Sequence, residues 1–193
     1  MRLGVLGGTF DPPHLAHLVL GDAAREQLGL ERVLWVPAGT PWRKQERDVT
    51  PAGHRIAMVE RAIAGNEAFE LCRLEVEREG PSYSVETLEE LRAQHVDAEL
   101  YFIIGQDALD DLPNWREPER LVDLATLAVA ARSGAAGRET PAGRDARIEW
   151  IEMPRLDISA TGLRRRAAQG LSLRYLVPAA VEEYILQHGL YRS

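Results

Sequence analysis

Short apolar runs alternate along this chain with longer segments in which apolar residues recur every three or four positions. Runs of the first kind are typical of buried strands, and segments of the second kind are typical of amphipathic helices. Because strands that alternate with helices usually form parallel sheets, the pattern predicts an α/β fold with helices on both faces of a mostly parallel sheet. We expect strands at Leu3–Leu6, Val33–Val36, Phe69–Val76, Leu100–Ile104, Leu127–Ala131 and Ile148–Ile151, helices at about His14–Leu28, Pro51–Ala64, Ser84–Gln94, Ser159–Gln169 and Pro178–His188, and short helical turns at Asp107–Leu112 and Glu117–Leu124.

The length of the chain, 193 residues, fits one domain with a sizeable core. We therefore predict a single domain over residues 1–193, with a C-terminal helical portion at about 159–193. No apolar run approaches ~20 residues, so no membrane span is expected, and the first residues show no signal-peptide pattern. Cys72 is the only cysteine, which excludes an internal disulfide and a cysteine-rich zinc site. We expect a cytoplasmic protein.

The net charge of −7 changes the picture for binding partners. Nucleic-acid binding needs a broad basic face, which an acidic chain of this kind does not favour. A small anionic ligand needs only a local positive cluster, so a phosphate ligand remains open. We expect small-molecule substrates and no nucleic acid, and the sequence leaves a homo-oligomer open.

A glycine turn followed by two histidines is the strongest candidate for chemistry. Gly7, Gly8 and Thr9 follow the first predicted strand, and His14 and His17 open the helix after it. Glycines let the backbone approach a ligand, and helix N-termini attract phosphate. Residues three apart share a helix face, so both imidazoles can point at one ligand. The local pattern predicts a phosphate site.

The two histidines allow two other interpretations. As zinc ligands of a metal-dependent hydrolase they would need a third protein ligand, and His54, His95 and His188 lie in scattered helical segments. As plain helix-start residues they would have only capping duties. The glycines also match neither a Walker A loop nor a Rossmann dinucleotide loop, which disfavours P-loop NTPases and NAD-dependent dehydrogenases. We predict no protein-held metal.

A second stretch, Ile158 to Arg164, places Ser159 and Thr161 at a helix start with Arg164 one turn further on. Hydroxyls and free N–H groups can bind phosphate oxygens there, and a guanidinium can bind them bidentately. Arg165 and Arg166 are expected to be surface charges.

Together, the two stretches resemble the signatures of the (T/H)xGH nucleotidyltransferase superfamily. The first is His14-Leu15-Ala16-His17, with Ala16 at the usual glycine, and the second is similar to I-S-S-T-x-x-R, with Ala160 for one serine. The resemblance implies a Rossmann-like nucleotidyltransferase fold that binds ATP. The ATP ligands that it implies are Gly7, Gly8, Thr9, Phe10, His14, His17, Ile158, Ser159, Thr161 and Arg164, with His14, His17 and Arg164 as catalytic residues. The resemblance of the middle of the chain, described next, adds Gly105 and Asp107 to the ATP ligands and Lys44 to the catalytic residues.

The middle of the chain resembles one family of that superfamily, the nicotinate-nucleotide adenylyltransferases. The segment Pro37–Lys44 is similar to the family's P-x-G-x-P-P-H-K loop, with Trp42 and Arg43 as departures, and Ser82–Leu88 is similar to S-Y-T-x-D-T-L. On physical grounds the second segment is a capped helix start, led by Ser84. The acceptor ligands that the resemblance implies are Thr9, Lys44, Tyr83, Ser84, Thr87, Trp115 and Arg132.

The resemblance implies adenylyl transfer from ATP to nicotinate mononucleotide, with Mg²⁺ held mainly by the ATP phosphates. Backbone N–H groups of the Ser82–Ser84 turn would hold the nicotinate carboxylate, and Trp115 would stack on the pyridine ring. Two alternatives remain open: the same chemistry on nicotinamide mononucleotide or phosphopantetheine, and a non-catalytic nucleotide-binding sensor on this fold.

Overall fold

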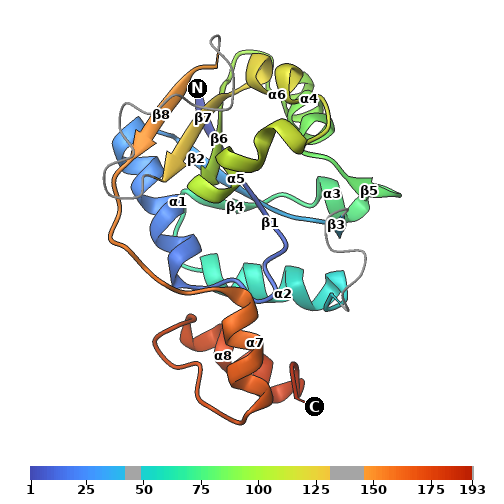
Figure 1. The fold of residues 1–193 in the computed structure, drawn as a ribbon, viewed down its shortest axis with the longest axis vertical. Coiled ribbons are helices and arrows are strands. Elements are labelled where there is room, and N and C mark those ends of the chain that lie inside the picture. Colours follow the sequence, from blue (N-terminus) through green and yellow to red (C-terminus); the bar gives the residue numbers. More distant parts are fainter. Residues whose placement is uncertain (42–48, 131–145, 193) are drawn as a thin grey trace.

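A six-stranded, fully parallel sheet forms the centre of the computed structural model, which describes residues 1–41, 49–130 and 146–192. The strand order is β4-β2-β1-β6-β7-β8 (Figure 1). The predicted α/β class is therefore confirmed. The strands are β1 (Arg2–Gly8), β2 (Arg32–Pro37), β4 (Phe69–Leu71), β6 (Glu99–Gly105), β7 (Thr126–Ala130) and β8 (Ile148–Ile151).

The sheet reverses its direction of growth between β1 and β6. The chain adds β2 and β4 on one side of β1 and then returns to add β6, β7 and β8 on the other. In the register of the central pair, Val5 lies opposite Phe102. Ligands of such sheets bind beyond the carboxyl ends of the strands at this switch point. The ends of β1 and β6, at Gly8 and Gly105, mark that place.

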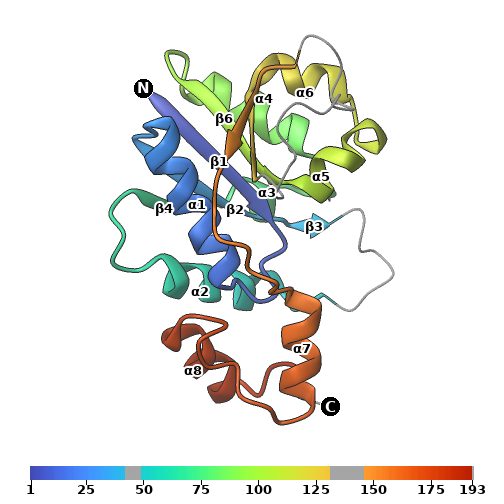
Figure 2. The ribbon, with the colours of Figure 1, turned by 60° about the vertical axis from the view of Figure 1, so that its left-hand side comes forward.

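Helices cover both faces of the sheet, because side chains that alternate along each strand are buried on both sides. On β1, Leu3 and Val5 join one apolar cluster and Leu6 joins the other. The first cluster is closed by α4, α5 and α6, and the second by α1 and α2 (Figure 2). The helices are α1 (Leu15–Leu28), α2 (Ala52–Ile63), α4 (Ser84–Gln94), α5 (Gln106–Asp111), α6 (Pro118–Leu124), α7 (Ala160–Ala168) and α8 (Ala179–Gln187).

The two C-terminal helices form a third layer of packing below the sheet, against α2 (Figure 1). Their apolar cluster includes Leu163 from α7, Val181 and Tyr184 from α8, and Met58 from α2. Because Met58 is fully buried there, α2 is held between the sheet and the C-terminal helices. This layer brings residues near the end of the chain close to the loops that follow the strands.

The structure differs from the sequence interpretation after β4. The strand expected over Phe69–Val76 ends at Leu71, and Leu74–Glu77 forms the short helix α3. The turn between them leaves Cys72 half-buried. A second sheet was not predicted, because its strands β3 (Thr40–Pro41) and β5 (Pro81–Ser82) are too short to show any period.

Among the described helices, none has the length and apolar character needed to cross a membrane.

Candidate functional site

The loop between β1 and α1 turns sharply around Phe10. The backbone of Phe10 is left-handed, with φ of 50°, which is unusual for a bulky residue. Its buried ring packs against Trp35 at 5.3 Å and, edge to face, against His17 at 5.1 Å. A Cβ atom on Gly8 would lie 3.0 Å from the Phe10 ring. The glycine therefore makes room for the ring that fixes the turn.

The two histidines at the start of α1 stack on each other. Their ring centroids lie 3.7 Å apart with an interplanar angle of 22°. The backbone N–H of His14 donates a hydrogen bond of 3.2 Å to Nδ1 of His17. Because this Nδ1 accepts, the neutral His17 ring carries its proton on Nε2. The geometry thus selects the tautomer whose outer nitrogen is a donor, which suits a phosphate oxygen.

His14 is buried with a polar atom in need of a partner. Its side chain is 5% exposed, and within the described part of the chain its Nδ1 has no hydrogen-bond partner. Burial lowers the pKa of His14 from 6.5 to about 4, so the ring is neutral at pH 7. A buried polar atom without a partner is costly, and a bound ligand would satisfy it.

The lowered pKa of His14 predicts a loss of stability in acid. Between pH 6.5 and about pH 4 the unfolded chain binds a proton at this residue that the folded chain does not. The free energy of unfolding should therefore fall as the pH falls through this window, by about 2 kcal/mol from pH 7.5 to pH 5. Urea unfolding at both pH values, compared with His14→Gln, isolates this contribution. An equal fall in both proteins would contradict the prediction.

The second motif meets the first at Asp11. Ser159 caps α7 by accepting a 3.1 Å hydrogen bond from the N–H of Gly162. One turn on, Nη1 of Arg164 donates to the carbonyl of Asp11 at 2.7 Å, and Nη2 donates to Oγ1 of Thr161 at 3.3 Å. Asp11 and Arg164 are 153 residues apart in sequence. The structure thus brings both signature motifs to one loop.

Arg55 ties three loops of the site together, a role that the sequence interpretation missed. The residue is 1% exposed, and its guanidinium donates to the carbonyls of Thr9 at 3.0 Å, Gly39 at 3.1 Å and Thr50 at 2.9 Å. Burial lowers the pKa of Arg55, and the nearby carboxylate of Asp11 opposes that shift. The sequence did hold a signal: Arg55 shares the buried face of α2 with Met58 and Val59.

The loop at Gly39 connects this region to the Ser82–Ser84 turn. The N–H of Gly39 donates to Oγ of Ser82 at 2.9 Å, and Arg55 holds the carbonyl of the same residue. A Cβ atom on Gly39 would collide with the backbone oxygen of Glu75. The two proposed substrate regions are therefore joined through one tightly packed glycine.

The start of α4 differs in detail from the expected cap. Tyr83, not Ser84, is the N-cap, and among the described residues no side chain caps this helix end. Thr87 is 2% exposed, and its hydroxyl donates to the carboxylate of Glu75 at 2.8 Å. Burial raises the pKa of Glu75. Thr87 thus stabilises the turn through its buried bond to Glu75, while Ser84 is partly exposed in the first turn of α4.

Trp115 and Tyr83 lie beside this turn. The indole of Trp115 donates to Asp111 at 3.3 Å and meets Phe102 edge to face at 6.1 Å. Arg116 lies over the ring of Tyr83, 4.5 Å from its centroid, and forms an ion pair of 3.0 Å with Glu86. These contacts hold the loop that carries the tryptophan against the start of α4.

Of the remaining predicted residues, Gly105, Asp107 and Ile158 are described by the structure, and two others are not. Gly105 is the N-cap of α5 at the end of β6, and Asp107 is exposed in the first turn. Ile158 packs against the C-terminal cluster. Lys44 and Arg132, both expected to contact substrate, lie outside the described residues.

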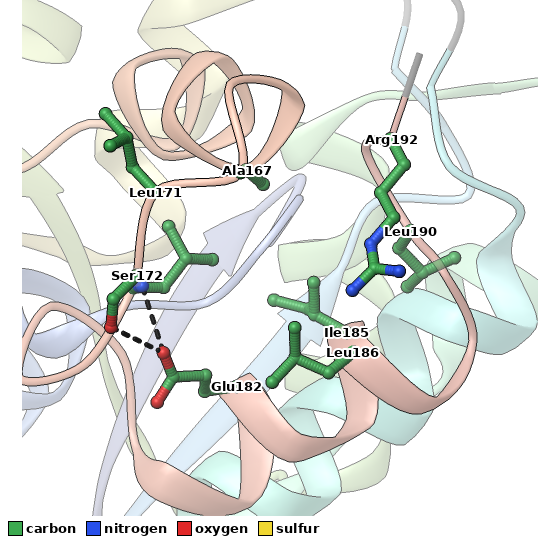
Figure 3. A pocket seen from close by; sticks show the side chains of 10 residues that line it. Ala167, Leu171, Ser172, Glu182, Ile185, Leu186, Leu190 and Arg192 are labelled. Atoms are coloured by element: carbon green, nitrogen blue, oxygen red, sulfur yellow. Dashed lines mark hydrogen bonds between the residues drawn. The ribbon is translucent and has the colours of Figure 1, made fainter.

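Two cavities among the described residues lie away from the two motifs. One cavity of about 290 Å³ lies between the end of α7, α8 and the chain after it, with Leu171, Leu186 and Arg192 in its wall (Figure 3). Another, of about 370 Å³, is lined by α1, the end of α2 and Phe69. Neither includes a residue of the two motifs, so the site is identified by its side chains and loops.

A family model for cytidylyltransferase-like proteins matches residues 5–166. Over its whole length the chain is similar to two bacterial proteins named "Probable nicotinate-nucleotide adenylyltransferase". It is 46% identical over 198 residues to the one from Thermomicrobium roseum, covering 100% of this chain and 92% of that protein. It is 46% identical over 192 residues to the one from Thermus thermophilus, with 100% of both chains covered.

Solved structures of Plasmodium falciparum nicotinic acid mononucleotide adenylyltransferase share the fold. The complex with APC gives a TM-score of 0.80 at 20% identity and covers 98% of this chain and 96% of that one. The complex with NaAD gives 0.80 at 21% identity and covers 98% and 97%. The expected Rossmann-like nucleotidyltransferase fold is thereby confirmed.

Proposed function

The chain belongs to the nicotinate-nucleotide adenylyltransferase family, and from that premise we infer that it transfers the adenylyl group of ATP to nicotinate mononucleotide in NAD biosynthesis. A phosphate oxygen of the mononucleotide attacks the α-phosphorus of ATP, the bond to the β-phosphate oxygen breaks, and pyrophosphate leaves. The products are deamido-NAD and pyrophosphate. The structural observation that supports this function is the bond from Arg164 to the carbonyl of Asp11, which brings the second motif against the loop that leads into the first.

The chemistry needs positioning and charge stabilisation more than proton transfer. The attacking phosphate oxygen is already anionic at pH 7, so no general base is required. In-line placement and donors aimed at the developing charge then lower the barrier. We assign that task to His14 and His17, with Thr9, Thr161 and Arg164 on the phosphates.

The proposal extends to Lys44, which would join these residues on the phosphates, and to Gly7, Gly8, Phe10, Gly105, Asp107, Ile158 and Ser159 around ATP. Mg²⁺ would enter with ATP, held mainly by the phosphates. The donor set supports this, since the described residues contain no group of three His, Cys, Asp or Glu side chains placed to hold an ion. We also place the protein in the cytoplasm.

On the acceptor side, Tyr83 and Ser84 form the turn proposed to hold the nicotinate carboxylate. Negative charge is favoured at a helix start, and the first turn of α4 supplies backbone N–H groups there. Trp115 would stack on the pyridine ring and Arg132 would complete the acceptor site, while the buried Thr87 would act indirectly, by fixing the turn through its bond to Glu75. Release of pyrophosphate from ATP with a panel of acceptor mononucleotides tests the function. Turnover with phosphopantetheine alone would refute it.

The same turn predicts a preference for the acid over the amide. Nicotinamide mononucleotide would present its own N–H groups to these donors and leave some of them unpaired. Each unsatisfied buried group costs about 1–3 kcal/mol, so two donors give a preference of at least roughly tenfold in kcat/KM. The assay compares both acceptors at equal ATP. Comparable kcat/KM values would instead indicate an enzyme with dual specificity.

A further inference from the structure

The C-terminal portion holds the start of α1 at three points. The N–H of Leu15 donates to the carbonyl of Leu176 at 3.0 Å, and Arg164 donates to the carbonyl of Asp11 at 2.7 Å. The hydroxyl of Tyr191 donates to Oδ1 of Asp11 at 2.6 Å. The last of these bonds joins residues 180 positions apart, and no sequence motif pointed to it.

Asp11 is placed to determine the positions of the two histidines. Its side chain is 4% exposed, and Oδ2 accepts a second hydrogen bond, of 3.3 Å, from the N–H of Thr50. Only Pro12 and Pro13 separate it from His14. Because proline rings fix φ, a shift at Asp11 passes to His14 with little absorbed between them.

Tyr191 is held in a backbone conformation that bulky residues disfavour. Its φ is 63°, in the left-handed region that costs a bulky residue energy. Such strain persists only where the surroundings determine it, and it recurs at Phe10 in the loop that Tyr191 contacts. Burial and the bond to Asp11 raise the pKa of Tyr191, so its hydroxyl remains a donor across the working pH range.

We propose that Tyr191 is a positioning residue for adenylyl transfer, which acts through the carboxylate of Asp11 to set the placement of His14 and His17. The proposal rests on the proposed function. Removing the hydroxyl leaves Asp11 with one donor fewer and lets the loop relax. Small displacements of catalytic groups are costly, with up to about a hundredfold for 1 Å. The effect belongs in kcat, since the substitution removes none of the groups proposed to contact phosphate.

The test compares Tyr191→Phe with Tyr184→Phe as a matched control. Both tyrosines lie in or beside the same apolar cluster, and both hydroxyls make one short hydrogen bond to a polar side chain. Tyr184 bonds to Nδ1 of His54 at 2.9 Å, in α2 and away from the loop. Kinetics with ATP and nicotinate mononucleotide and thermal unfolding are measured for both variants and the unsubstituted protein.

We expect Tyr191→Phe to lower kcat about tenfold, with KM for ATP changed less than about threefold. Tyr184→Phe should keep kcat within about twofold, although its melting temperature should fall about as much as that of Tyr191→Phe. Equal kcat losses in the two variants, a loss confined to KM, or no loss in Tyr191→Phe would each overturn the proposal. An unsubstituted protein that forms no deamido-NAD would refute the proposed function instead, and this proposal with it.

Discussion

Replacing His17 by alanine is expected to lower kcat by roughly 10²–10³ while KM for ATP changes little. The proton of the neutral ring lies on Nε2 because Nδ1 accepts from the backbone of His14. A donor fixed in this way meets charge that develops on the transferring phosphate more than charge in the ground state. Steady-state kinetics with varied ATP separate the two parameters.

Two conservative variants separate the roles of the two ring nitrogens. His17→Asn keeps an acceptor near the position of Nδ1 and loses the outer donor, so it should remain folded and slow. His17→Gln can place an amide N–H near the position of Nε2 and should recover part of the lost kcat. His95→Ala, at the far end of α4, is the control. A loss expressed wholly as a higher KM for ATP would count against the assignment.

The largest expected loss of stability follows from Gly39→Ala, which should lower the free energy of unfolding by about 3 kcal/mol or more. The added methyl group would meet the backbone oxygen of Glu75, and a backbone atom cannot rotate away as a side chain can. The collision would also disturb the bonds of Gly39 to Ser82 and Arg55. Urea unfolding at pH 7.5 measures the change.

Gly53→Ala is the matched control with the opposite sign. Gly53 lies inside α2, and apart from the helix's own backbone no atom of the described residues comes within 4 Å of the position that its Cβ would take. Because alanine favours helix over glycine, this substitution should raise stability by about 0.5–1 kcal/mol. A cost below about 1 kcal/mol for Gly39→Ala would show that α3 moves aside easily.

Periodicity predicted most of the fold because its signals are local. The helix expected at Ser84–Gln94 has those bounds in the structure, and the strand expected at Leu3–Leu6 lies inside β1. The alternation of Phe69–Val76 was misleading, because a buried glutamate, Glu75, sits in a short helix where the pattern indicated a strand. Local patterns carry no information on such tertiary contacts.

The residues of the site that belong to sequence motifs were predicted, and the single residues that hold the site in place were missed. The meeting of Asp11 with Arg164 agrees with the pairing of the two motifs, although the atoms involved could not be foreseen. An arginine in an amphipathic helix, such as Arg55, is usually a surface charge, so its burial was unexpected. Tyr191 lies in no motif at all. Their partners are backbone and carboxylate oxygens distant in sequence, which only the folded chain reveals.

The bond between Asp11 and Tyr191 also has a consequence for the order of assembly. Contacts between residues 180 positions apart require the closure of a very long loop, so they form late in folding. The C-terminal helices rest mainly on their own apolar cluster with α2, and partial opening of such a unit takes less free energy than melting the sheet. The catalytic arrangement would then form last during folding and be lost first during unfolding. On warming, activity would therefore be lost while most of the sheet is still intact.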